Sequence, residues 1–161
     1  MRAKKIRKTC LSSPQALLLD SGILIALFSK NPTEQKRASE ATMLMSNYPH
    51  ASRHLVTPCL VELFYKVRKF ISPEDVKKNL DFLSITLLPT AGKIENDIFS
   101  SYVQINYKNH FDYADYYLCQ CALLFRSSMI LTIDKDDMPL ALNTAQKYLK
   151  SSNECRLVSF D

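Results

Sequence analysis

The sequence predicts an α/β domain built around a parallel β-sheet. Short apolar segments that fit buried strands alternate with segments of about 10–17 residues whose apolar positions recur at helical spacing. The chain of 161 residues has the length of a single domain, and no internal repeat, linker or low-complexity segment interrupts the alternation. The two glycines are too few for a glycine-rich phosphate loop, which excludes P-loop and dinucleotide-binding proteins.

The elements follow in a regular order. We expect strands at 16–19, 54–56, 85–88 and 129–133, and a possible fifth strand at 156–160. We expect helices at 21–28, 31–48, 57–70, 72–83, 91–107, 112–125 and 140–150. Several helix starts carry capping signals: Asn31 precedes Pro32 and stands three residues before Glu34, Ser72 precedes a proline, and Asp112 precedes the sixth helix.

The composition indicates a globular protein without a membrane span. Hydrophobic residues make up 47% of the chain, and no apolar run approaches the roughly 18 residues that a span needs. Asp20 interrupts the apolar run that follows the basic amino terminus, and no small-residue cleavage site follows, which argues against a signal peptide. The five cysteines are scattered and the three histidines show no metal-ligand spacing with them. Reduced thiols in a cytoplasmic protein are the simplest expectation.

The net charge of +5 is confined to the amino terminus. Its carriers are Arg2, Lys4, Lys5, Arg7 and Lys8. Of the 21 basic side chains, the other 16 are matched by 16 acidic ones. Residues 1–15 therefore form a basic extension ahead of a domain at 16–161. The extension is either an RNA-binding tail or a merely solubilising terminus, and the sequence leaves both open.

Acidic residues fall where the predicted sheet would bring them together. Asp20 directly follows the first strand and Asp134 follows the fourth, while Glu62 and Asp115 lie about one turn into helices. In open α/β sheets, ligands bind beyond the carboxyl ends of the strands, so these four acids are expected on one rim.

Each acid also has an ordinary structural interpretation. Asp112 fits a helix N-cap, and Asp115 and Glu62 could stabilise helix starts through the helix dipole. Asp134, Asp136 and Asp137 could form a solvated turn. The ordinary interpretation is weaker for the whole set, because Asp20 and Glu62 are flanked by apolar residues.

A cluster of four carboxylates requires protons or cations. Two carboxylates about 4 Å apart repel each other by roughly 4 kcal/mol at an effective dielectric constant of 20. Oxygen ligands without histidine or cysteine suit Mg²⁺ or Mn²⁺, which are completed by water and substrate phosphate. Such a site activates a water molecule and stabilises the leaving oxygen of a phosphodiester.

The segments "LLLDSGILIALF", "VTPCLVELFYKV", "FDYADYYLCQCAL" and "LTIDKDD" resemble, in order and spacing, the four acidic motifs of the PIN-domain family. The likeness covers residues 17 to about 158 and is greatest to VapC-type toxins of toxin–antitoxin pairs. It implies a three-layer α/β/α fold with a mostly parallel sheet of four to five strands. It also implies that Asp20, Glu62, Asp115 and Asp134 coordinate metal, with Ser21 and Thr132 hydrogen-bonding among them. The family's activity is metal-dependent RNA cleavage, and the VapC type is typically a homodimer inhibited by an antitoxin.

Three features depart from the family pattern. The residue after the third aspartate is usually small, whereas here it is Tyr116. The basic residues 1–15 extend beyond the usual start. Asp136 and Asp137 add acid near the fourth motif, so which of the three aspartates reaches a metal stays open, as does the choice between one and two metals. Asp134 fits the motif best.

The resulting hypothesis is a Mg²⁺- or Mn²⁺-dependent endoribonuclease, the toxin of a toxin–antitoxin pair. Asp20, Glu62 and Asp115 would hold the catalytic metal, and Asp134 would support a second metal or order water. One alternative is a catalytically silent module of the same fold that binds RNA or a protein. Another is a phosphotransferase with Asp20 as nucleophile, although Gly22 stands where such enzymes usually carry a second aspartate.

Overall fold

The fold is organised around a sheet of five parallel strands. The computed structural model describes residues 13–106 and 111–160. The strands are β1 (Ala16–Leu19), β2 (Ser52–Leu55), β3 (Ile85–Leu87), β4 (Ser127–Thr132) and β5 (Glu154–Ser159), in the spatial order β3-β2-β1-β4-β5. Every neighbouring pair is parallel, so all five carboxyl ends lie at one edge of the sheet.

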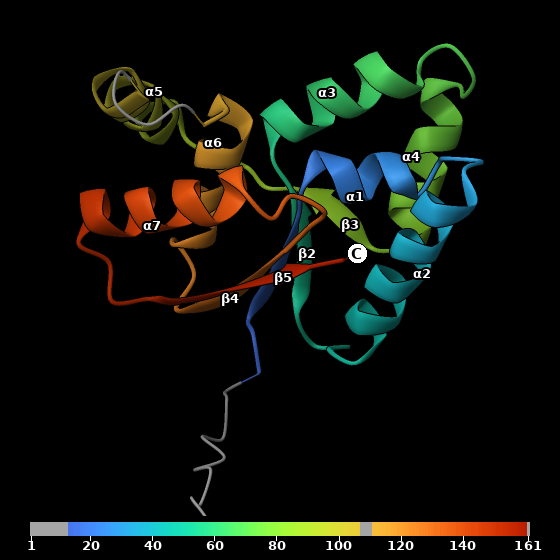
Figure 1. The fold of residues 1–161 in the computed structure, drawn as a ribbon, viewed down its shortest axis with the longest axis horizontal. Helices are drawn as coiled ribbons and strands as arrows, with labels where there is room; N and C mark the ends of the chain where they lie inside the picture. The colour runs from blue at the N-terminus through green and yellow to red at the C-terminus, as the bar shows by residue number, and fades with distance from the viewer. Residues whose placement is uncertain (1–12, 107–110, 161) are drawn as a thin grey trace, which may run out of the picture.

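Seven helices in the described residues cover the two faces of the sheet (Figure 1). They are α1 (Ser21–Ala26), α2 (Pro32–Ser46), α3 (Thr57–Val67), α4 (Pro73–Phe82), α5 (Gly92–Asn106), α6 (Tyr113–Ala122) and α7 (Asp137–Leu149). The crossovers β1–β2 and β2–β3 run in one direction across the sheet, and β3–β4 and β4–β5 run in the other. Right-handed crossovers therefore place α1–α4 on one face and α5–α7 on the opposite face. The predicted α/β/α arrangement is confirmed.

The middle of the sheet forms the centre of the hydrophobic core. All residues of β1 and β4 are buried, and the β1 side chains have no exposed surface. Strands covered on both faces lose the alternation of polar and apolar residues, which explains the continuous run "ALLL". The edge strands β3 and β5 are largely accessible.

Two helices from opposite layers meet at the carboxyl edge of the sheet. Helix α3 starts immediately after β2, and α6 runs back toward the start of β4, so both amino termini lie at this edge. The two helices contact each other there, which brings the second and third acidic segments together.

The expected elements are all present, with differences at their ends. Helix α3 ends at Val67 and not at residue 70, because the chain turns there and the amides of Phe70 and Ile71 donate to the Val67 carbonyl. Helix α7 starts at Asp137 and not at residue 140. Pro139 is no obstacle, since proline is tolerated in a first helical turn. Helix α1 has only six residues, fewer than the expected range.

Within the described residues, the chain is hydrogen-bonded to the sheet from Gln15 onward. Gln15 forms the first hydrogen bonds to the sheet, donating to the Ser127 carbonyl and accepting from the Ser52 amide. The five basic residues of the extension, Arg2, Lys4, Lys5, Arg7 and Lys8, lie outside the described residues. In the part of the chain that is described, no helix has the length and apolarity needed to cross a bilayer.

Candidate functional site

Asp20 is a buried carboxylate at the point where the chain direction across the sheet reverses. It follows β1, whose neighbours β2 and β4 are reached by crossovers on opposite faces, so Asp20 stands at a topological switch point. Its side chain is 5% exposed. It occupies the N-cap position of α1 without capping the helix. Its carboxylate instead accepts hydrogen bonds from Thr132 Oγ1 (2.7 Å, to Oδ2) and Ser21 Oγ (3.2 Å, to Oδ1).

The two hydroxyls partly offset the cost of burying this charge. Burial raises the pKa of Asp20 above its usual value, while the hydrogen bonds from Thr132 and Ser21 act in the opposite direction. The negative charge of Glu62 adds to the increase. These bonds hold the Asp20 carboxylate in one orientation, but neither hydroxyl supplies a positive charge to balance it.

Asp115 is an acid whose surroundings strongly favour the protonated form. Burial, then the negative charges of Asp20, Asp112, Asp134 and Asp137, raise the pKa of Asp115 to about 8. A carboxyl group with this pKa is largely protonated at pH 7. No hydrogen bond or ion pair reaches its carboxylate from the rest of the described chain. A cation bound in place of the proton would offset both the cost of burying the carboxylate and its repulsion by the neighbouring aspartates.

Glu62 reaches the same region from α3. It lies in the second turn of that helix, is half-buried, and is close enough to Asp20 to raise that residue's pKa. Helix α3 is amphipathic, with Cys59, Leu63 and Val67 against the core, so Glu62 lies at the border between its buried and exposed faces.

Asp134 belongs to a tight turn that links β4 to α7. Its Oδ1 accepts from the amides of Asp136 (2.8 Å) and Asp137 (3.1 Å), which explains why α7 begins early. Its own amide donates to Thr132 Oγ1 (2.9 Å), the hydroxyl that donates to Asp20. One threonine therefore ties the first and fourth acidic segments together. Asp136 and Asp137 are exposed, and the charge of Asp137 contributes to the raised pKa of Asp115.

The first turn of α6 holds two acids with different roles: Asp112 is structural, and Asp115 is a candidate metal ligand. Asp112 caps the helix, with Oδ1 accepting from the Ala114 amide (2.9 Å), as the ordinary interpretation predicts. Asp115, three residues later, makes no capping bond. The helix dipole favours a carboxylate here, but a cap accounts only for Asp112.

The four acids form a loose cluster and not a finished metal site. Electrostatic effects link Asp20 to Glu62 and link Asp115 to both Asp20 and Asp134. Yet the described residues contain no group of three or more His, Cys, Asp or Glu side chains already arranged to hold an ion. The donor set is chemically suited to Mg²⁺ or Mn²⁺, because it offers carboxylate oxygens and no soft ligand. The carboxylates would have to draw together around the ion.

Cys59 lies beneath the acids and was missed by sequence reasoning. Its thiol is fully buried, and burial followed by the charge of Asp20 raises its pKa well above the usual value. The thiol therefore stays protonated in the metal-free protein. Its position three residues before Glu62 on α3 is the signal that could have placed it near the site.

Position 22 has no room for a side chain. A Cβ atom added to Gly22 would lie 2.6 Å from Ile133 Cγ1 and 2.9 Å from Ile133 Cδ1. A second aspartate two residues after Asp20, as in phosphotransferases with an aspartyl nucleophile, would have to displace the Ile133 side chain.

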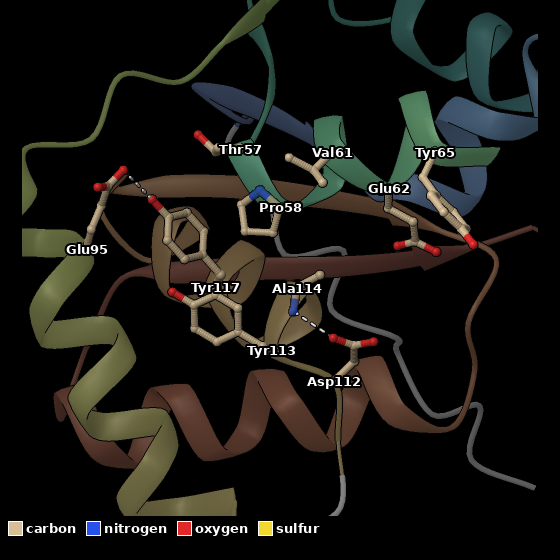
Figure 2. Close-up of a pocket in the computed structure, with 10 residues that line it drawn as sticks. All are labelled: Thr57, Pro58, Val61, Glu62, Tyr65, Glu95, Asp112, Tyr113, Ala114 and Tyr117. Atoms are coloured by element: carbon tan, nitrogen blue, oxygen red, sulfur yellow. Dashed lines mark hydrogen bonds between the residues drawn. The ribbon is translucent and has the colours of Figure 1, made fainter. Parts of the chain in front are cut away.

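A cavity of about 670 Å³ adjoins the acidic cluster (Figure 2). It lies between the first turns of α3, the start of α5 and the first turns of α6. Glu62 and Asp112 line one end and Glu95 lines the other, with Pro58 and Tyr113 between them. Asp20, Asp115 and Asp134 do not line it. The cavity is therefore a neighbour of the cluster and not the cluster itself.

Comparison with protein-family models, with curated proteins and with solved structures finds no match to this chain.

Proposed function

We propose that this protein is a Mg²⁺- or Mn²⁺-dependent endoribonuclease that cleaves phosphodiester bonds at the Asp20 cluster. The observation that carries the proposal is a buried, hydroxyl-oriented carboxylate at the switch point, close to a second carboxyl group whose pKa is about 8. A carboxyl pKa that is strongly raised by burial and by specific charged neighbours marks a candidate functional site. The ordered resemblance to the PIN-domain motifs supports the choice of RNA as substrate.

The residues would divide the work as follows. Asp20, Glu62 and Asp115 would hold the catalytic ion, and Asp134 would support a second ion or order water. A bound ion would supply an activated water molecule and stabilise the leaving oxygen. Thr132 and Ser21 keep both Asp20 oxygens oriented, through bonds of 2.7 Å and 3.2 Å. Asp115 must release its proton to become a ligand, so ion binding and deprotonation are coupled at this residue.

The biological setting is also part of the proposal. The VapC-like motifs support a toxin that works in the cytoplasm, forms a homodimer and is inhibited by a cognate antitoxin. Helices α3 and α5 carry exposed apolar side chains, including Val61, Tyr65, Phe99 and Val103, which is compatible with a protein partner. Co-expression with the product of the neighbouring reading frame, followed by co-purification and a growth assay, tests this setting.

The decisive experiment measures cleavage of labelled RNA with Mg²⁺ or Mn²⁺ and with excess EDTA. We expect cleavage only with metal, and we expect Asp20→Asn and Glu62→Gln to abolish it. Asp97→Asn on α5 is the matched control, because Asp97 is exposed and does not line the cavity described above. Cleavage that persists unchanged in EDTA would contradict the mechanism. Tight RNA binding by wild type without cleavage under any divalent metal would favour the catalytically silent alternative.

A further inference from the structure

The cavity beside the acidic cluster has a lining that selects against phosphate. Glu62 and Asp112 stand at one end and Glu95 at the other, and none of the described residues that line it is a lysine or arginine. With Glu62 assigned to the proposed metal ion, Asp112 and Glu95 would still repel an anionic group from the rest of the cavity. Whatever enters from a nucleic acid is therefore the uncharged base and not the backbone.

The walls between the carboxylates are flat and apolar. Pro58 and Val61 come from α3, and Tyr113 and Tyr117 come from α6 (Figure 2). Tyr65 closes the end near Glu62 and is 61% exposed. Aromatic side chains beside a nucleic-acid path serve as stacking platforms for bases. The dimensions also suit a small planar group, since ligand pockets typically enclose about 300–1,000 Å³.

The far end of the cavity holds an exposed carboxylate that two hydroxyls orient. Glu95 Oε1 accepts from Thr90 Oγ1 (2.7 Å) and lies 3.3 Å from the Tyr117 hydroxyl, which donates to it. The Tyr117 and Thr90 hydroxyls are 2.7 Å apart, so the three residues form one network. Burial raises the pKa of Tyr117 to about 12, so the phenol keeps its proton. Both bonds to the Glu95 carboxylate go to Oε1.

A positioned carboxylate recognises amino groups. Acidic side chains accept hydrogen bonds from exocyclic amines, as they do from cytosine N4. Adenine and guanine carry comparable amines, whereas uracil has no amine, and its one donor on that edge, N3–H, lies between two carbonyl oxygens that a carboxylate repels. The chemistry at Glu95 therefore discriminates against uracil.

Positive charge for the backbone lies just outside the cavity. The Arg68 guanidinium stands 4.6 Å from the centroid of the Tyr65 ring, at the end of α3. A nucleotide whose base entered the cavity beside Tyr65 would have this cation within reach of a phosphate. The acidic cavity thus suits the uncharged base of a nucleotide, and the Arg68 cation outside it suits the phosphate.

We infer that the cavity between α3, α5 and α6 is a base-binding subsite for single-stranded RNA, and that Glu95 selects an amino-bearing base beside the scissile phosphate. The inference rests on the proposed function and specifies the substrate of that same site. It adds Glu95, Tyr113 and Tyr117 as specificity-determining residues that take no part in the cleavage chemistry.

The test maps cleavage sites in a randomised single-stranded RNA pool incubated with full-length protein and Mg²⁺ or Mn²⁺. Wild type should show adenine, cytosine or guanine at least about fivefold enriched over uracil at one fixed position from the cut. Glu95→Gln should reduce this preference to below about twofold and still cleave, because an amide both donates and accepts. Asp97→Asn, two residues along the same helix, should keep the wild-type preference.

Two further variants test the stacking wall. Tyr113→Ala should raise KM at least about fivefold with little change in kcat, as expected for the loss of a stacking platform. Val61→Glu adds a carboxylate at a position that is 63% exposed, where folding is not at risk, and should raise KM likewise.

The outcomes separate the two proposals. Metal-dependent cleavage with identical nucleotide frequencies for wild type and Glu95→Gln overturns the subsite and leaves the nuclease intact. Absence of metal-dependent cleavage by wild type removes the nuclease and the subsite together. A change of oligomeric state in Val61→Glu, with unchanged RNA preference and KM, would assign the cavity to a second copy of the chain and overturn the subsite.

Discussion

Replacing Asp115 with asparagine should stabilise the metal-free protein. The side chain keeps its size but can no longer ionise, whereas the wild-type carboxyl must stay protonated in the fold, since burial and four neighbouring aspartates raise the pKa of Asp115 to about 8. The asparagine amide can also donate a hydrogen bond to a neighbouring carboxylate. Stability gained at the expense of activity is the expected trade-off at a strained functional site.

The size of the effect follows from the pKa difference. In the unfolded chain Asp115 ionises near its usual value of 3.8, while in the folded protein it stays protonated up to about 8. At pH 7 this pKa difference lowers the wild-type free energy of unfolding by at most about 4 kcal/mol, compared with a protein that lacks the ionisable group. Solvent screens part of it, because the side chain is only half-buried, so we expect the free energy of unfolding to rise by about 2 kcal/mol. This is roughly 4–8 °C in Tm for a chain of this size.

The pH dependence has a definite sign. Between about pH 4 and 8 the unfolded state releases the Asp115 proton and the folded state retains it. The wild-type free energy of unfolding therefore falls as pH rises through this window, with other groups held equal. Asp115→Asn lacks this contribution, so its advantage over wild type should be absent near pH 4, grow with pH and level off above pH 8.

Urea melts of both proteins in EDTA at pH 5, 6, 7 and 8 measure this difference, with the exposed Asp97→Asn as control. Added Mg²⁺ at 100 times its dissociation constant should stabilise wild type by about 2.7 kcal/mol and leave the variant largely unchanged. A variant that is less stable than wild type at every pH, or a stability difference that does not vary with pH, would contradict the raised pKa of Asp115. Asp115 would then be a structural residue.

Three other predictions concern Thr132, Gly22 and the basic amino terminus. Thr132→Val removes the 2.7 Å bond to Asp20 and should raise the pKa of Asp20 further, so a pH–rate profile should show a greater loss of cleavage at pH 6 than at pH 8. Gly22→Ala should lower the free energy of unfolding by about 1–3 kcal/mol in a urea melt, and a second change, Ile133→Ala, should restore part of it by making room for the new methyl group. Deleting residues 1–12 from the inactive Asp20→Asn protein should weaken RNA binding by an amount that shrinks as salt rises, if the basic tail contacts phosphates. Parallel salt slopes for full-length and truncated protein would show the tail to be a solubilising appendage.

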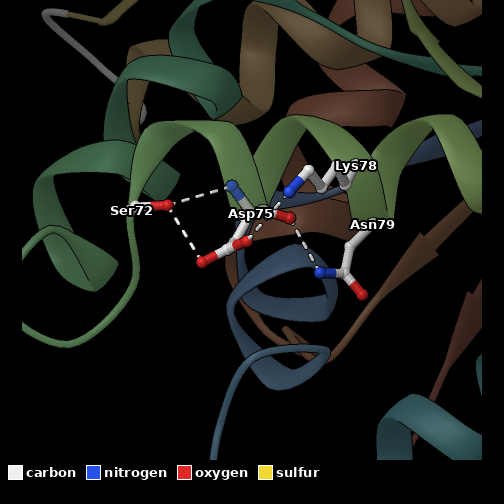
Figure 3. Close-up of polar contacts among 4 residues, drawn as sticks. All are labelled: Ser72, Asp75, Lys78 and Asn79. Carbon is white, nitrogen blue, oxygen red and sulfur yellow. Dashed lines mark hydrogen bonds and ion pairs between the residues drawn. The ribbon is translucent and has the colours of Figure 1, made fainter.

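Local signals predicted where helices begin. The start of α4 is an example: Ser72 Oγ accepts from the Asp75 amide (3.1 Å) and donates to Asp75 Oδ2 (2.9 Å), as Figure 3 shows. Lys78 and Asn79 contact the same Asp75, at its carboxylate and its carbonyl. Every partner lies within seven residues of sequence, so nothing beyond the segment is needed to predict it.

Helix ends and the state of the acids depend on distant segments. Asn31 caps α2 through the Thr33 amide, but no bond from Glu34 completes the predicted capping box. Asp112 and Asp115 share one helical turn, and only the approach of Asp20 and Asp134 from the sheet makes their environments differ. The strand order that brings those segments together is not encoded in any short pattern. The cavity beside Glu62 likewise exists only because α3 and α6 arrive from opposite layers.

Because the sheet is parallel, the two termini of the domain differ in how close they lie to the acidic rim. This difference matters for anything attached to them. Polypeptide preceding Ser13 joins next to the starts of β4 and β5, since Ser13 and Gln15 share a pocket with Ser127 and Glu154. Strand β1 then spans four residues, or about 13 Å, before Asp20 is reached. At the other terminus the Phe160 amide donates to the carbonyl of Thr132, the residue that orients Asp20. An affinity tag or a surface tether at the amino terminus should therefore leave the acidic rim open. The same tag at the carboxyl terminus would emerge beside the rim and compete with RNA for access.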